Sequence, residues 1–397
     1  MKSRRLSRKR SRAAIVTAAA ASVVAGAAML PSWSAGAASV AEDPKVDPAT
    51  KATFQQLADA VFTDRTEALV DGTASAQQKG RHHHKTSRFS GKVKLSQKQS
   101  RAENSALSEL RGRKDRLAKL GEKYSAAKTE VALDATRVKG RKATVDVTET
   151  TTLTYAKAKG GEPKTTGFQA HHRLTFQADK QGDWQLTGIR DTDDGVAVNQ
   201  PAEPPVVAPD TADDGNPPSA TRSATTQPAP AAPKNFTASG YDYNAMADYA
   251  AKHWNNYNPD YPDFNGAGAG GDCTNFVSQA LKAGGWKHVP GYTYDFHNWF
   301  GNSEIQSDSF VGVNEFSWFA LSSKRATGLA NVYQMDVGDV LQVDFDRDGS
   351  KDHSMIVNYR SPQGVPYLTY HSTNTYNRSV ASIIASYPTA YYYAYRT

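Results

Sequence analysis

The chain has 397 residues and carries 47 Lys and Arg against 40 Asp and Glu, a formal net charge of +7. Its length allows two ordinary domains. The single cysteine, Cys273, excludes a disulfide within the chain, so stability has to come from hydrophobic cores.

The first 38 residues have the pattern of a secretory signal. Seven basic residues and no acidic one precede an uncharged, Ala- and Val-rich stretch at residues 13–30, and small residues follow at Ala35–Ala37. A permanent membrane span is the weaker alternative, because the stretch is rich in alanine and is broken by Gly26 and Pro31. We therefore expect a secreted, extracellular protein, and removal of the signal would remove the whole net charge.

Residues 45–194 predict a small α+β domain. Apolar residues recur at helical spacing in residues 45–72, and a charged helical pattern runs from about Ser105 to Ala127. The period then changes to two, which predicts a meander of strands up to Ile189. Helices followed by a meander resemble cystatin-like and nuclear-transport-factor-like domains by topology, so we expect a binding or spacing role for this front module.

One segment of the front module is strongly basic. Residues Lys79–Lys142 contain 19 basic and 6 acidic residues. Such a charge fits electrostatic binding of an anionic cell-wall polymer, and the alternative is a solvated segment without a partner. Secretion argues against a nucleic acid as the partner.

A linker follows the front module. Residues 195–236 are rich in Pro and Ala, which favours an extended, hydrated chain that would hold two modules apart. The rear module, residues 238–397, opens with a helical pattern at residues 244–255. The glycine-rich run Gly266–Gly271 comes next. It lacks a following Lys-Ser or Lys-Thr and a preceding strand, so we do not expect a phosphate-binding loop.

Cys273 lies where this run gives way to a predicted helix at residues 273–282. A thiol in the first turn of a helix feels the positive end of the helix dipole, which stabilises the thiolate and favours attack on a carbonyl carbon. The backbone N–H groups of Asp272 and Cys273 would be free to bind an oxyanion. The alternative is a buried structural cysteine that packs as a small hydrophobic residue.

A thiolate nucleophile needs a base, and His353 is the candidate. It begins a predicted strand, and a second strand ends at His371 after a turn near residue 362. Positions whose numbers sum to about 725 pair in such a hairpin, which places His371 or its neighbour opposite His353. We therefore predict that His371 orients His353 and fixes its tautomer, with Asn374 as the alternative third member.

Four sequence blocks of the rear module, taken in order, resemble the amidase-domain family of secreted Gram-positive proteins. They are Gly271-Asp-Cys-Thr-Asn-Phe-Val-Ser-Gln-Ala-Leu, Val337-Gly-Asp-Val-Leu-Gln-Val-Asp, Asp352-His-Ser-Met-Ile-Val and Tyr370-His-Ser-Thr-Asn-Thr. NlpC-type and CHAP cell-wall hydrolases, whose fold is papain-like, have a similar order of cysteine helix and histidine strand. Cys273 and His353 match the cysteine and histidine of those families, whereas the third polar residue varies among them.

This resemblance implies a papain-like α+β catalytic domain behind the small front domain. The implied activity is that of a secreted, monomeric cysteine amidase or peptidase without a cofactor. It would cut amide bonds of peptidoglycan through a thioester acyl-enzyme. Two alternatives stay open: a non-catalytic wall-binding protein with a relict hydrolase fold, and an acyl transferase, since an amine can resolve the same thioester.

Two further groups of residues are candidates for binding. Four aspartates follow the spacing of a calcium loop, but Met355 stands where such a loop has its glutamate, so a hydrated turn between strands is the favoured alternative. Tyr294 and Trp299 belong to an aromatic stretch and are candidates to line a cleft for a peptide or a sugar. The four aspartates are Asp344, Asp346, Asp348 and Asp352.

Overall fold

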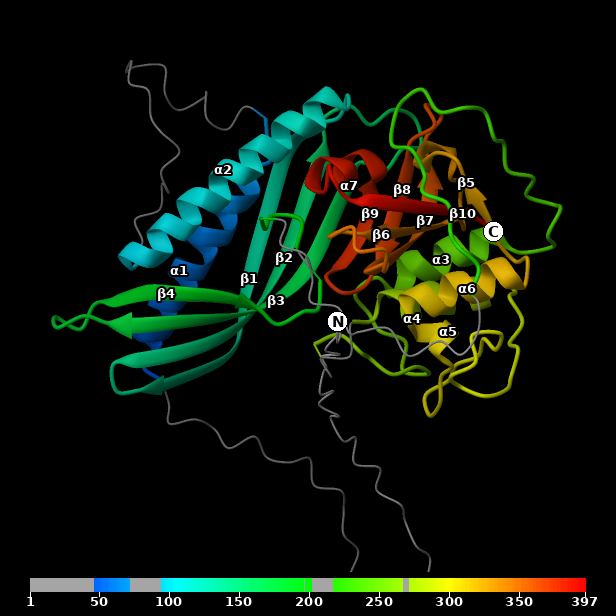
Figure 1. Ribbon diagram of the computed structural model, residues 1–397. Helices are drawn as coiled ribbons and strands as arrows, with labels where there is room; N and C mark the ends of the chain where they lie inside the picture. Colours follow the sequence, from blue (N-terminus) through cyan, green and yellow to red (C-terminus); the bar gives the residue numbers. More distant parts are fainter. Residues whose placement is uncertain (1–45, 72–93, 196, 202–216, 267–270) are drawn as a thin grey trace, which may run out of the picture. The chain divides into compact units, whose positions relative to one another are not determined.

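The computed structural model describes residues 46–71, 94–195, 197–201, 217–266 and 271–397. The predicted signal, the first part of the basic segment and the middle of the predicted linker lie outside the described residues. The described chain is a mixed α+β structure built on one large antiparallel sheet, which confirms the predicted α+β class (Figure 1). In these ranges no helix has the length and hydropathy that a membrane crossing requires.

The front module consists of two long helices packed on a four-stranded meander. Asp47 caps the first helix, since its carboxylate accepts the N–H of Thr50 at 2.9 Å. Apolar side chains of this helix, among them Phe54 and Phe62, pack on Val145 of the sheet, which confirms the predicted helical stripe. The elements are α1 (Pro48–Glu67), α2 (Gln97–Lys119), β1 (Tyr124–Lys139), β2 (Lys142–Tyr155), β3 (Thr165–Ala178) and β4 (Trp184–Asp191).

The rear module has helices on both faces of its strands. Its helices are α3 (Tyr243–His253), α4 (Cys273–Ala283), α5 (Asp308–Val311), α6 (Val313–Ser322) and α7 (Val380–Ser386), with a 3-10 turn at Val332–Gln334. Its strands are β5 (Thr327–Leu329), β6 (Val340–Asp344), β7 (His353–Arg360), β8 (Pro366–Tyr370), β9 (Asn374–Ser379) and β10 (Tyr391–Arg396). The predicted helices at the start of the module and the predicted hairpin of β7 and β8 are confirmed.

The sheet runs without a break through both modules. Its strand order is β1-β2-β3-β9-β8-β7-β6-β10-β5, with β4 paired to β3, so β3 of the front module pairs with β9 of the rear module. Residues of both modules also share one apolar core, in which Tyr155 and Phe168 pack with Tyr367 and Ala381. The described residues of the two modules therefore belong to one compact unit.

Residues 217–236 of the predicted linker lie on the rear module, whereas residues 197–201 lie on the front module, where Arg113 donates to two of their carbonyls. Ser223 donates its N–H to the carbonyl of Tyr392 at 2.7 Å, and the buried Lys234 ammonium pairs with Asp339 at 2.7 Å. Extended Pro- and Ala-rich chain can bury its polar groups in this way when neighbouring strands supply partners. The described linker residues therefore lie against a module and do not hold two modules apart.

Successive residues of β7 face opposite sides of the sheet, as the two-residue period of a strand requires. Ile356 packs in one core with Phe276 and Val277 of α4. Met355 and Val357 pack in another core with residues of α7. The sheet thus separates an α4 side from an α7 side, and this separation decides which site residues meet.

Candidate active site

Cys273 is the first residue of α4 and is only 2% exposed. Its Sγ lies 3.8 Å from Thr274 Oγ1, and the backbone N–H of Ser354 also donates to it. Burial raises the pKa of the thiol to about 11 and outweighs these hydrogen bonds, which lower it. The thiol is therefore neutral at pH 7 in this state, whereas the helix dipole alone predicts a thiolate.

The His371 imidazole contacts the side chain of the residue directly before the cysteine. Its Nδ1 lies 2.6 Å from Asp272 Oδ2, and its Nε2 lies 2.7 Å from the carbonyl oxygen of His253. The ring is stacked between Tyr257 and Phe276, at centroid distances of 4.0 and 4.1 Å. Both ring nitrogens thus have a partner already, and neither is left for another histidine.

Asp272 is held by contacts on both its side chain and its backbone. Its Oδ1 accepts the N–H of Phe264 at 3.2 Å and the side-chain amide of Asn275 at 2.8 Å. Its own N–H donates to Ser372 Oγ at 2.7 Å. The Asp272 N–H that the sequence suggested for an oxyanion is therefore occupied by Ser372 in this state.

His353 lies on the α7 side of the sheet. Its ring meets Tyr370 edge-on at a centroid distance of 5.0 Å, and neither of its nitrogens forms a hydrogen bond with a described residue. Burial, together with the nearby Arg378 guanidinium, lowers the pKa of the imidazole to about 3. The ring is neutral at pH 7, and its protonation is costly as long as it stays in this environment.

The hairpin register explains why the two histidines do not meet. Ile356 pairs with Thr369 and Val357 with Leu368, so the numbers of these paired residues sum to 725 as expected, and a register shift nearer the turn raises the sum to 726. Continued past the last paired residues, this register sets His371 against Ser354, on the α4 side. The predicted contact in which His371 orients His353 is therefore not formed, because adjacent strand residues point to opposite faces.

The alternative third member, Asn374, also belongs to the α4 side. It begins β9, and its Oδ1 accepts the hydroxyl of Tyr257 at 2.8 Å. Since Tyr257 stacks on His371, Asn374 is connected to His371 and not to His353.

Of the two predicted cleft residues, only Tyr294 is at the surface, where it is 63% exposed. Trp299 is fully buried, and its indole N–H donates to Ser278 Oγ at 3.2 Å. Its ring packs against Phe310 and Phe319, so it is a core residue and not a cleft wall. A large aromatic run in a sequence does not by itself separate core positions from surface positions.

The aspartate loop forms a tight turn between β6 and β7. Oxygens of Asp344, Asp346 and Asp348 lie within 4.8 Å of one another. Each of these carboxylates also accepts a backbone N–H of the same turn. Burial raises the pKa of Asp352 to about 7, and its carboxyl accepts the N–H of Phe345 at 2.6 Å. These contacts fit the hydrated turn, and calcium binding stays a prediction.

The region with these contacts is similar to an amidase family. Residues 240–395 match the family model described as "Putative amidase domain". Two proteins of Bacillus subtilis (strain 168), named "Uncharacterized protein YhbB" and "Uncharacterized protein YjcM", are each 31% identical to this chain, over 142 and 148 residues. The matches cover 34% and 35% of this chain and 44% and 32% of those proteins, so the chain spans less than half the length of either relative.

One solved structure also matches. The intermembrane space region of chloroplast protein ARC6 is 16% identical, with a TM-score of 0.23, over 37% of this chain and 98% of that one. A TM-score this low supports no conclusion about the fold. The similarity to a "Putative amidase domain" therefore concerns residues 240–395, and it suggests amide hydrolysis for this region.

The sequence did not reveal the pairing of Asp272 with His371. The one local signal was the position of Asp272 directly before the cysteine, which equally suits a helix cap. That aspartate makes no side-chain capping hydrogen bond, because its carboxylate is used by His371 and by the loop before α4.

Proposed function

We propose that the protein is a cysteine-dependent amide hydrolase that acts on the peptide part of cell-wall peptidoglycan. The observation that carries this proposal is the position of Cys273. It begins α4 directly after Asp272, whose carboxylate is paired with His371 at 2.6 Å, inside the region that matches an amidase family. The predicted secretory signal supports a substrate outside the cell membrane.

In this proposal Cys273 is the nucleophile and His353 is the base. The N–H of Ser354 lies at the thiol, and His353 is the preceding residue but points to the opposite face of β7. The proposal therefore requires the end of this strand to rearrange and turn the imidazole toward the thiol. Asp272 and His371 position the start of α4 and do not exchange protons with the substrate. The state with a buried, neutral thiol is then a resting state.

The reaction proceeds in two steps. His353 takes the thiol proton, Sγ forms a bond to the carbonyl carbon, and the carbonyl electrons move to the oxygen, which the N–H groups at the start of α4 stabilise. The C–N bond then breaks, and His353 returns the proton to the leaving amine. Water, deprotonated by the same histidine, attacks the thioester and releases the acid and the thiol.

The test is digestion of purified peptidoglycan by the full chain, followed by mass spectrometry of the released fragments. We expect the wild type to release fragments with new amine termini, and Cys273→Ala to reduce the rate by at least about 10³-fold. Cys273→Ser is the conservative companion and should be similarly impaired. Equal release by the wild type and Cys273→Ala would disprove the mechanism, and mass spectrometry would also show transfer to an amine.

A further inference from the structure

A segment of the front module lies against the backbone that leads to Cys273. The segment is Asp193–Gly195, directly after β4. Asp194 accepts the N–H of Gly266 at 2.8 Å and donates its own N–H to Asn265 Oδ1 at 3.2 Å. The Asn265 amide in turn donates to Asp193 Oδ1 at 2.9 Å. Three hydrogen bonds thus join the front module to the start of the glycine-rich run.

The end of the same run touches the same segment. Gly271 has a φ of +96°, and a Cβ at this position would lie 3.3 Å from the Cβ of Asp194 and 2.4 Å from Ser372 Oγ. A Cβ on Gly195 would lie 1.5 Å from the carbonyl oxygen of Ser372, so this contact requires glycine. Asp194 is therefore bonded to Gly266 and borders Gly271, the two described ends of the run.

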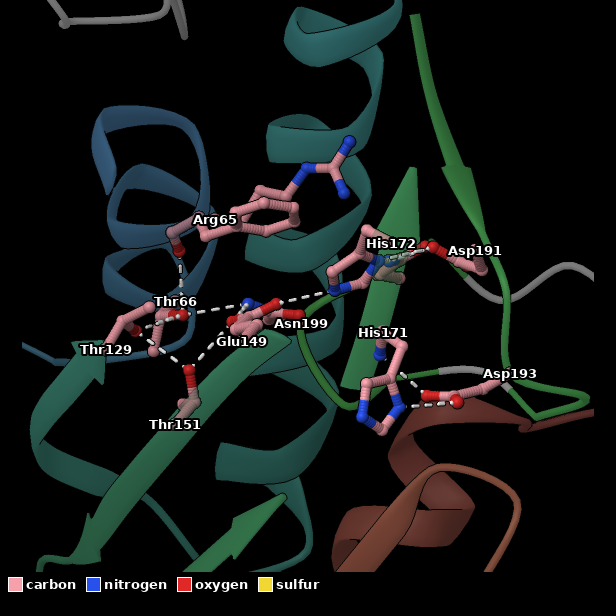
Figure 2. A network of polar contacts seen from close by, with 12 residues as sticks. Arg65, Thr66, Thr129, Glu149, Thr151, His171, His172, Asp191, Asp193 and Asn199 are labelled. Atoms are coloured by element: carbon pink, nitrogen blue, oxygen red, sulfur yellow. Dashed lines mark hydrogen bonds and ion pairs between the residues drawn. The ribbon is translucent and has the colours of Figure 1, made fainter. Parts of the chain in front are cut away.

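The segment itself is anchored firmly in the front module. The carboxylate of Asp193 accepts the backbone N–H of His171 at 2.8 Å and pairs with its Nδ1 at 2.9 Å, as Figure 2 shows. On the other side, the buried Arg113 guanidinium donates to the carbonyls of Val198 and Gln200, both at 2.6 Å. A segment fixed at both ends can hold a neighbouring backbone in one place.

We infer that Asp194 of the front module is a positioning residue of the amidase site, because it holds the backbone that leads to Cys273. This inference rests on the proposed function of Cys273. The front module is then part of the catalytic unit. The carboxylate of Asp194 accepts the N–H of Gly266, and the Asp194 side chain limits the space around Gly271, two residues before the nucleophile.

The test compares Asp194→Ala with Asp194→Asn in the full chain. Asparagine keeps an oxygen acceptor for the Gly266 N–H, whereas alanine removes it. We expect kcat on peptidoglycan to fall about 10- to 100-fold in Asp194→Ala with little change in KM, since misplacing a nucleophile by about 1 Å has effects of this size. Asp194→Asn should stay within about threefold of the wild type.

Asp179→Ala is the matched control. Asp179 is a half-buried aspartate in the turn between β3 and β4 that also accepts backbone N–H groups, from Gln181 and Asp183. Its hydrogen bonds with described residues stay within this turn, and its replacement should leave kcat unchanged. The same melting temperature for Asp194→Ala and Asp179→Ala would show that a lower kcat does not come from partial unfolding.

A second measurement does not depend on activity. Hydrogen–deuterium exchange should be faster at the Gly266 amide in Asp194→Ala, and unchanged in Asp194→Asn and Asp179→Ala. Unchanged exchange at the Gly266 amide in Asp194→Ala would overturn the positioning role. A kcat of Asp194→Ala equal to that of the wild type would also overturn it. A kcat above that of the wild type would overturn it as well and would mean that the segment blocks the site. A wild type that releases no fragments would instead overturn the proposed function.

Discussion

Two buried histidines, one in each module, have opposite electrostatic environments. His172 lies between Asp191 at 2.8 Å and Glu149 at 3.2 Å (Figure 2). Burial alone would lower its pKa, but these two carboxylates outweigh burial and raise the pKa to about 9. His353 is also buried, yet no described residue accepts a hydrogen bond from it and Arg378 lies nearby, so its pKa is lowered to about 3. Charged neighbours, and not depth, decide the protonation state.

The difference indicates different roles for the two regions. Around His172 the charges are compensated, since Arg65 pairs with Glu103 at 2.7 Å, and Asn199 donates to Glu149 at 2.6 Å. Such a network stabilises one arrangement of α1, α2 and the sheet. The uncompensated ring of His353 gains from any rearrangement that gives it a partner, as the proposed mechanism requires.

The largest expected effect is a loss of stability when His172 is replaced, compared with the replacement of His353. His172→Leu leaves the buried carboxylate of Glu149 and the half-buried carboxylate of Asp191 without their cation, and we expect a loss of about 3–5 kcal/mol in the free energy of unfolding. His353→Leu removes no hydrogen bond and should change stability by less than about 1.5 kcal/mol. Urea unfolding monitored by circular dichroism measures both. Equal losses in the two variants would contradict the comparison.

The next effect is a loss of stability at alkaline pH that depends on His172. Its folded pKa of about 9 lies above the unfolded value of about 6.5, so its contribution is complete below pH 6.5 and is lost as the pH rises through 9. Over this range we expect a loss of about 3 kcal/mol relative to His172→Leu. Urea unfolding of both proteins between pH 6 and 9.5 tests this, and parallel pH profiles would refute it.

The smallest effect has the opposite direction and depends on His353. Its folded pKa of about 3 lies below the unfolded value, so the unfolded chain binds the proton first and stability is lost as the pH falls below 6.5. Between pH 6.5 and 5 we expect a loss of about 2 kcal/mol relative to His353→Leu. The difference between the two proteins cancels the titration of other groups. An acid limb that persists unchanged in His353→Leu would rule out this assignment.

Local patterns in the sequence predicted much of the fold. The apolar stripe of α1, the change to strands at β1 and the start of α4 at Cys273 all depend on residues close together in the chain. The register of β7 and β8 was also predictable, because a short turn determines which residues pair. The prediction for His371 failed by one position, which in a strand is enough to move a side chain to the opposite face.

The sequence by itself therefore determined the order of the elements, the position of Cys273 at a helix start and the similarity of the rear module to an amidase family. Only the tertiary structure decided that the thiol is buried, that Asp272 pairs with His371, and that Asp194 holds the backbone before Cys273. The physical reason is that pKa values depend on how far water is excluded and on which charges lie nearby. Those neighbours come from distant parts of the chain: His371 meets Asp272 within the rear module, and Asp194 reaches Gly266 from the front module that shares its sheet.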